Sequence, residues 1–86
     1  MGPFVVSLRV LPRWHLHLTF DNGEERLFDV APYLDRGVFR QLRDGRFAAA
    51  RVVSGSVEWP GEIDLSYDTL YLRSAALPLP GTEVTQ

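Results

Sequence analysis

Residues 14–30, WHLHLTFDNGEERLFDV, decide the fold, because they join two strand-like runs through a turn of recognisable chemistry. Every second residue from Trp14 to Phe20 is apolar, which is typical of a strand with one buried face. Asp21-Asn22-Gly23 can close either a two-residue type I′ loop or a three-residue loop with Gly23 left-handed in a G1 bulge. The segment is therefore predicted to be a β-hairpin.

The two loops predict different registers. The two-residue loop pairs Leu16 with Asp29 and sets a carboxylate among core residues, whereas the three-residue loop pairs Leu16 with Phe28. A slip of one residue exchanges the two faces of a strand, so the apolar pattern favours the three-residue loop. The predicted apolar face consists of Trp14, Leu16, Leu18, Phe20, Phe28 and Val30. The predicted opposite face consists of His15, His17, Thr19, Glu25, Leu27 and Asp29.

Length and composition limit the classes of protein. The chain has 86 residues, a net charge of −2 and no cysteine, so we expect one domain over residues 1–76 and a flexible tail over residues 77–86. The charge gives no reason to expect nucleic-acid binding, and disulfides and thiolate metal sites are excluded. No apolar run approaches the roughly 20 residues of a membrane span, and no signal-peptide pattern is present, so we expect a cytoplasmic protein.

The segments on either side of the hairpin supply further elements. Phe4–Leu11 is predicted to be an antiparallel strand that turns into the hairpin at Pro12-Arg13, with one face formed by Phe4, Val6, Leu8 and Val10. Asp35 is predicted to cap a short helix over Arg36–Arg43, with Val38, Phe39 and Leu42 on its apolar face. Gly45 is the expected left-handed stop of that helix.

The second half of the chain predicts another hairpin. Residues Phe47–Trp59 are expected to turn at Ser54-Gly55 and to pair Val52 with Val57, Ala50 with Trp59 and Arg51 with Glu58. Asp64–Leu72 is compatible with a short helix capped by Ser66 or with a strand over Thr69–Arg73, and we favour the helix. The predicted fold is α+β: a small antiparallel sheet built from an N-terminal strand and two β-hairpins, with one or two short helices.

Polar clusters offer candidate chemistry. His15, His17 and Asp29 share the polar face of the first hairpin and have the ligand types of a zinc or nickel site. We favour instead an exposed polar face with a weak His–Asp pair, and we predict no metal. Glu62, Asp64 and Asp68 lie near Tyr67 and Tyr71 in the sequence, where caps and loop ends also select acids. We predict no catalytic residue and no cofactor. The stripe Arg36, Arg40 and Arg43 is bracketed by Asp35 and Asp44 and is interpreted as a solvated helix face.

Aromatic residues are the strongest indication of an interaction. A chain this short has a high ratio of surface to volume, and aromatic side chains dominate protein interfaces as well as cores. We therefore expect a protein partner or a homodimer. The candidate interaction residues are Trp14, Tyr33, Trp59, Tyr67 and Tyr71.

Several short runs together resemble a known family. They are Phe20-Asp-x-Gly23, Phe28-Asp29-Val30-x-Pro32-x-Leu34, Gly37-Val38-Phe39-x-x-Leu42-x-Asp44 with Phe47, Val57-x-Trp59, Asp64-Leu65 and Leu70-Tyr71. Over about residues 4–74 the chain resembles the bacterial domain-of-unknown-function family 2442, which implies a small α+β domain with a curled antiparallel sheet and no assigned catalytic residue.

The resemblance also bears on partners. Some members of that family carry a helix-turn-helix DNA-binding domain after this module, and others lie beside genes for a second small protein, as in a toxin–antitoxin pair. Since too few residues follow Ser74 for a helix-turn-helix, we expect a protein partner and not DNA. The predicted function is a non-enzymatic protein-interaction module, the antitoxin-like member of a small two-gene pair. The alternatives are a homodimeric scaffold, or a small-ligand or metal-binding protein using His15, His17 and Asp29.

Overall fold

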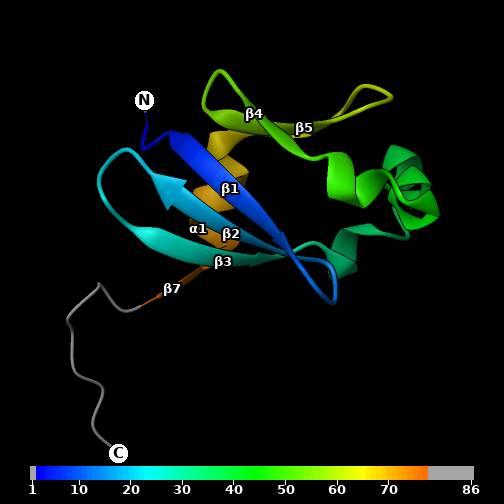
Figure 1. Cartoon of the computed structure of the whole chain (residues 1–86), viewed down its shortest axis with the longest axis horizontal. Coiled ribbons are helices and arrows are strands. Elements are labelled where there is room, and N and C mark those ends of the chain that lie inside the picture. Colours follow the sequence, from blue (N-terminus) through cyan, green and yellow to red (C-terminus); the bar gives the residue numbers. More distant parts are fainter. Residues whose placement is uncertain (1, 78–86) are drawn as a thin grey trace, which may run out of the picture.

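The computed structural model describes residues 2–77, which form two antiparallel sheets, one α-helix and three 3-10 helices. The first sheet has the strand order β1-β2-β3-β7 and the second has the order β4-β5-β6. Figure 1 shows α1 behind the first sheet. The second sheet lies next to β1, on the side away from β2. The predicted α+β class is confirmed. None of the helices within residues 2–77 combines the length and the apolar character needed to cross a membrane.

The first hairpin has the predicted register. Strands β2 (His15–Phe20) and β3 (Glu25–Asp29) pair Leu16 with Phe28 and Leu18 with Arg26. Gly23 has φ +90° and its N–H donates to the Phe20 carbonyl over 3.0 Å. The three-residue loop with a left-handed glycine is therefore confirmed, and the apolar pattern chose the correct face of the hairpin.

Strand β1 (Val5–Leu11) contains an irregularity that the sequence did not predict. Val5 is opposite Phe20 and Ser7 is opposite Thr19, so Val6 is an extra residue in a β-bulge. The bulge buries Val5 and leaves Val6 56% exposed. The prediction that Phe4 and Val6 share a buried face with Leu8 and Val10 is wrong for the first two residues, because the bulge shifts the alternation by one.

The chain then forms 3-10 turns where a short helix was expected. These are η1 (Ala31–Tyr33), η2 (Gly37–Asp44) and η3 (Arg46–Ala49). Asp35 does not cap η2: the capping position is occupied by Arg36, and the Asp35 carboxylate accepts a hydrogen bond from Arg43 Nη2 over 2.6 Å instead. The predicted left-handed stop at Gly45 is confirmed by its φ of +105°.

The second hairpin is formed by β4 (Arg51–Val53) and β5 (Ser56–Trp59), which pair Val52 with Val57 and Arg51 with Glu58 as predicted. The first residues of the predicted hairpin, from Phe47, lie in η3 and not in a strand, so that part of the prediction is wrong. Strand β6 (Ile63–Leu65), which lies beside β5 as a third strand, was not predicted from the sequence.

The C-terminal part of the described chain forms a helix and adds the last strand to the first sheet. Helix α1 (Tyr67–Arg73) begins at Ser66, whose side chain accepts from the Thr69 N–H, which confirms the predicted helix and its cap. Strand β7 (Ala75–Ala76) pairs with β3, and the Leu77 N–H donates to the Glu25 carbonyl over 2.9 Å. The rest of the predicted tail, residues 78–86, lies outside the described residues.

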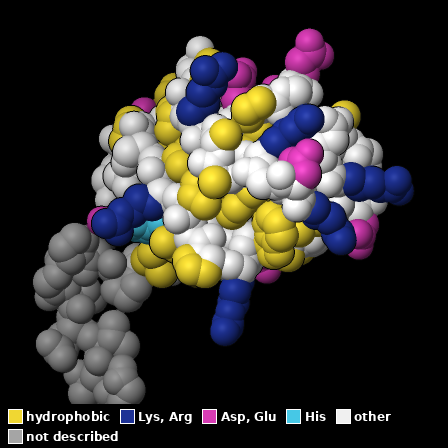
Figure 2. Space-filling model, turned by 45° about the vertical axis from the view of Figure 1, so that its right-hand side comes forward, with side chains coloured by type: hydrophobic (Ala, Val, Ile, Leu, Met, Phe, Trp, Pro, Cys, Tyr) yellow, Lys and Arg dark blue, Asp and Glu magenta, His cyan; other side chains and the backbone are white. Residues whose placement is uncertain are grey.

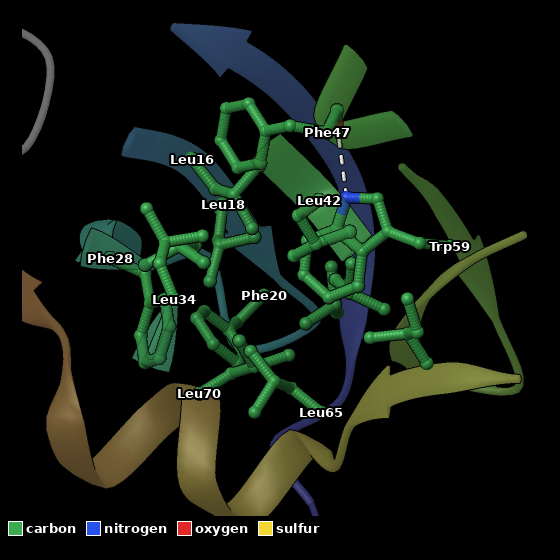
Figure 3. Packing of buried hydrophobic residues seen from close by; sticks show 14 residues of the cluster. Leu16, Leu18, Phe20, Phe28, Leu34, Leu42, Phe47, Trp59, Leu65 and Leu70 are labelled. Atoms are coloured by element: carbon green, nitrogen blue, oxygen red, sulfur yellow. Dashed lines mark hydrogen bonds between the residues drawn. The ribbon is translucent and has the colours of Figure 1, made fainter. Parts of the chain in front are cut away.

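One hydrophobic core joins the two sheets. Figure 3 shows side chains of β2 and β3 directed toward those of α1 and the second sheet. Trp59 closes this core, with its indole N–H donating to the Phe47 carbonyl over 3.0 Å. The buried residues are Val5, Leu16, Leu18, Phe20, Phe28, Val30, Leu34, Leu42, Phe47, Val57, Trp59, Ile63, Leu65 and Leu70.

Candidate functional site

The five aromatic residues that we expected at an interface are all buried or partly buried. Trp59 is 2% exposed and belongs to the core, so it presents no area to a partner. The other four are partly buried, and each packs on another ring. Trp14 lies against Phe47, Tyr33 against Phe28, Tyr67 against Phe4, and Tyr71 against Phe20.

Tyr71 belongs to a polar network that joins α1 to the first hairpin. Its hydroxyl donates to Glu24 Oε2 over 2.5 Å, and Arg26 Nη1 donates to Glu24 Oε1 over 2.6 Å. Arg26 also donates to the Ser74 hydroxyl and carbonyl, over 2.6 and 2.9 Å, and its guanidinium lies 4.5 Å from the centre of the Tyr71 ring. Both oxygens of the Glu24 carboxylate are thus held by donors from two elements.

This network shifts two pKa values in opposite directions. The hydroxyl of Tyr71 and the guanidinium of Arg26 lower the pKa of Glu24, because they stabilise its carboxylate form. The same carboxylate raises the pKa of Tyr71, since it accepts a hydrogen bond from the neutral phenol and repels the phenolate. Perturbed pKa values occur in catalytic sites and in structural networks alike, and here every polar group is already bonded within the fold.

The sequence contained a signal for this network. The predicted register placed Arg26 opposite Leu18, on the face of the hairpin that packs on the core. An arginine on a buried face needs a partner from the layer packed against it, and α1 supplies Tyr71 and Ser74. The partner itself was not evident from the sequence, because it comes from the far end of the chain.

The two histidines take separate partners. His17 Nε2 lies 2.9 Å from Glu25 Oε1, while His15 Nε2 lies 3.9 Å from Asp29 Oδ2. The His15 ring also approaches the Arg13 carbonyl through Nδ1, over 2.9 Å. Within residues 2–77 no group of three or more histidine, aspartate or glutamate side chains is arranged to hold a metal ion. His15, His17 and Asp29 are therefore not gathered into one cluster in this part of the chain, since His17 lies against Glu25 and His15 is nearer Asp29.

The acidic residues singled out in the sequence are only partly brought together. Glu62 and Asp64 line a shallow pocket of about 350 Å³ that also includes Arg51 and Glu58. Arg51 and Glu58 pair across the second hairpin at 3.7 Å. Asp68 lies on α1 and is not among the residues lining this pocket.

The three arginines of the predicted basic stripe on η2 make different contacts. Arg43 binds the Asp35 carboxylate and Arg40 donates to the Asp35 carbonyl over 3.4 Å. Arg36 lies over the ring of Tyr33, with 5.7 Å between its guanidinium carbon and the ring centre. On the side turned forward in Figure 2, the basic side chains are spread over the surface, several of them beside acidic side chains, and form no continuous patch.

Arg36 also lines a shallow pocket of about 220 Å³ where β3 ends and α1 ends. The lining residues are Phe28, Asp29, Pro32, Tyr33, Arg36 and Arg73. Arg73 is the last residue of α1, so the pocket combines residues from two distant parts of the chain. Of these residues, the sequence had pointed to Tyr33 as an interaction residue, to Asp29 as a metal ligand and to Arg36 as part of a stripe.

The outer edge of the first sheet is a second candidate site. Strand β1 is the outermost strand on one side, while β7 covers the other side. The turn between β4 and β5 meets the start of β1, where the Val5 N–H donates to the Gly55 carbonyl over 2.9 Å. In Figure 1 the two strands β1 and β4 diverge from that point.

A family model described as "Protein of unknown function (DUF2442)" matches residues 5–76. The chain belongs to this family, as the resemblance of its short runs indicated. No curated protein and no solved structure matches the chain significantly.

Proposed function

We propose that this DUF2442 domain is a non-enzymatic protein-interaction module that binds a strand of its partner along the free edge of β1. The observation that carries the proposal is the place of β1 at the end of the first sheet, with Val6 56% exposed beside an edge whose one charged residue is Arg9. An unguarded edge of this kind is a template for strand addition.

The backbone of β1 supports this use. In β2 the Phe20 N–H donates to the Glu24 carbonyl, and the Trp14 carbonyl accepts from Val30, so the even-numbered residues of β2 bond β3. Antiparallel bonding alternates between neighbours, so the odd-numbered residues bond β1. Their opposite residues include Ser7 and Arg9. The N–H and C=O groups of Leu8 and Val10 consequently point away from β2, toward the open edge.

The partner strand is either foreign or that of a second copy. In a two-fold arrangement centred on Leu8, Arg9 faces Ser7 of the other copy, so no like charges meet. A small protein encoded beside this one is the first foreign partner to test, in keeping with the antitoxin-like role expected from the sequence. The proposal keeps the cytoplasmic location expected from the sequence.

Two valine substitutions test the edge. Val6→Lys places a charge on the exposed part of β1, which is how natural sheets block pairing. Val38→Lys is the matched control, because Val38 is 48% exposed but lies on η2. Sedimentation of the purified chain measures self-association, and capture with the neighbouring gene product measures foreign binding.

We expect association in one of the two assays, lost in Val6→Lys and retained in Val38→Lys. A wild-type chain that is monomeric and captures no partner would refute the proposal. Association that Val6→Lys leaves intact would show that the binding surface lies elsewhere.

A further inference from the structure

We propose that the pocket lined by Tyr33, Arg36 and Arg73 binds a small oxyanion, namely the phosphate or carboxylate group of a low-molecular-weight ligand. This site lies at the ends of β3 and α1. It does not depend on association at β1, so the two proposals succeed or fail separately.

The charge of the two arginines is available to a ligand. Arg26, Arg43, Arg46 and Arg51 each lie within 4.0 Å of a carboxylate oxygen. Within residues 2–77, neither Arg36 nor Arg73 forms an ion pair. Two guanidinium groups from separate elements therefore border one pocket without an acidic side chain bound to either.

Asp29, the acidic residue lining the pocket, is already engaged. Its Oδ1 accepts a hydrogen bond from the Ala31 N–H over 2.9 Å, and its Oδ2 lies 3.9 Å from His15 Nε2. One oxygen of the Asp29 carboxylate thus stabilises the turn after β3, and the other lies near His15 of β2.

Tyr33 gives the pocket a fixed wall. Its ring centre lies 5.6 Å from that of Phe28 and 5.7 Å from that of Phe39, and Arg36 stacks over it. A guanidinium that lies over an aromatic ring has less freedom than one in open solvent, so less side-chain entropy is lost when it binds an anion. Among the described residues the Tyr33 hydroxyl forms no hydrogen bond and remains a donor for the same anion.

Size and chemistry select the ligand class. At about 220 Å³ the pocket is smaller than the roughly 300–1,000 Å³ of sites that enclose drug-sized ligands. Guanidinium groups form paired hydrogen bonds with carboxylate and phosphate oxygens. The pocket therefore suits one anionic group with few further atoms, and not a complete nucleotide.

The test is a titration of the full chain with inorganic phosphate and, separately, with acetate at constant ionic strength. Nuclear magnetic resonance follows the side-chain N–H groups of Arg36 and Arg73 and the backbone amide of Tyr33. The variants are Arg36→Gln and Arg73→Gln, and the control is Arg40→Gln, which changes an exposed arginine of η2 that does not line the pocket.

We expect saturable shifts with one or both anions, and the stronger anion identifies the ligand class. Each pocket variant should weaken binding by about tenfold or more, since a hydrogen bond to a charged group contributes that much, while Arg40→Gln should bind normally. The proposal is overturned if neither anion gives a saturable shift in the wild-type chain. A chain that carries both Arg36→Gln and Arg73→Gln and binds the anion as tightly as the wild-type chain would overturn it as well.

Discussion

The Tyr71 hydroxyl donates a hydrogen bond of 2.5 Å to the Glu24 carboxylate across 47 positions of sequence. This bond fastens α1 to the hairpin turn that sets the register of the first sheet. Arg26 contacts both residues, because it donates a hydrogen bond to Glu24 and its guanidinium lies over the Tyr71 ring. The Glu24 carboxylate therefore takes part both in the hairpin turn and in a contact between residues that are far apart in the sequence.

Tyr71→Phe removes the hydroxyl and leaves the ring on Phe20. We expect a lower urea midpoint, because Glu24 loses its shortest hydrogen bond and α1 loses a link to the hairpin. Tyr33→Phe is the matched control, since the Tyr33 hydroxyl has no hydrogen bond within residues 2–77. Equal midpoints for the two variants would mean that the bond to Glu24 adds nothing to stability.

The same pair predicts a dependence of stability on pH. The pKa of Glu24 is lowered by folding, so its contribution is present above the ordinary glutamate pKa of about 4.3 and is lost as pH falls through the lower folded value. The pKa of Tyr71 is raised, so its contribution is present below about pH 10 and is lost as pH rises through the higher folded value.

Urea melts of wild type and Tyr71→Phe across this range measure the contribution. The difference between their midpoints should be largest near neutral pH and should shrink toward strong acid and strong alkali. A difference that stays constant from acid to alkali would contradict the assignment of the bond to these two ionisable groups.

Substitution of Gly23 tests the turn that fixes the register. A Cβ added at Gly23 would meet no atom within 4 Å apart from its own chain neighbours, so any cost comes from its φ of +90°. Gly23→Val should lower the free energy of unfolding by about 1–2 kcal/mol or more, because a β-branched residue fits positive φ badly. Gly23→Asn should cost less, since asparagine tolerates this region. Equal urea midpoints for Gly23→Val and wild type would refute this account.

Parts of the fold that depend on local pattern were predictable. The register of β2 and β3 follows from alternating apolar residues and one glycine, and the α1 cap follows from Ser66. The bulge at Val6 was not predictable, because it depends on contacts of its neighbours with Gly55 and Asp21, which come from other hairpins. Strand β6 has only three residues between a turn and the start of α1, too few to show a clear alternation.

The candidate sites show the same division. The free edge of β1 follows from the strand order, in which β1 is outermost. The pocket of Arg36 and Arg73 was not foreseen, because its two arginines come from opposite halves of the chain. Nothing in the spacing around Arg73 marks it as a neighbour of Tyr33, and only the packing of α1 on the first sheet brings them together.

The last prediction concerns Gly55, where the second hairpin meets β1. Gly55 has φ +82°, and a Cβ added there would lie 2.7 Å from the Phe4 ring and 2.8 Å from its Cβ. Gly55→Ala therefore adds a steric clash to the cost of positive φ. Gly23→Ala is the matched control, because it carries the backbone cost, about 1–2 kcal/mol, in open space.

We expect Gly55→Ala to lower the urea midpoint more than Gly23→Ala does. Relief of the clash must move Phe4 or the turn, and either movement weakens the bond from the Val5 N–H to the Gly55 carbonyl. Hydrogen exchange of the Val5 amide should accelerate in Gly55→Ala but not in Gly23→Ala. If both variants melt alike and protect Val5 alike, the hairpin does not anchor the start of β1. The open edge would then begin at Val5 and not beyond it.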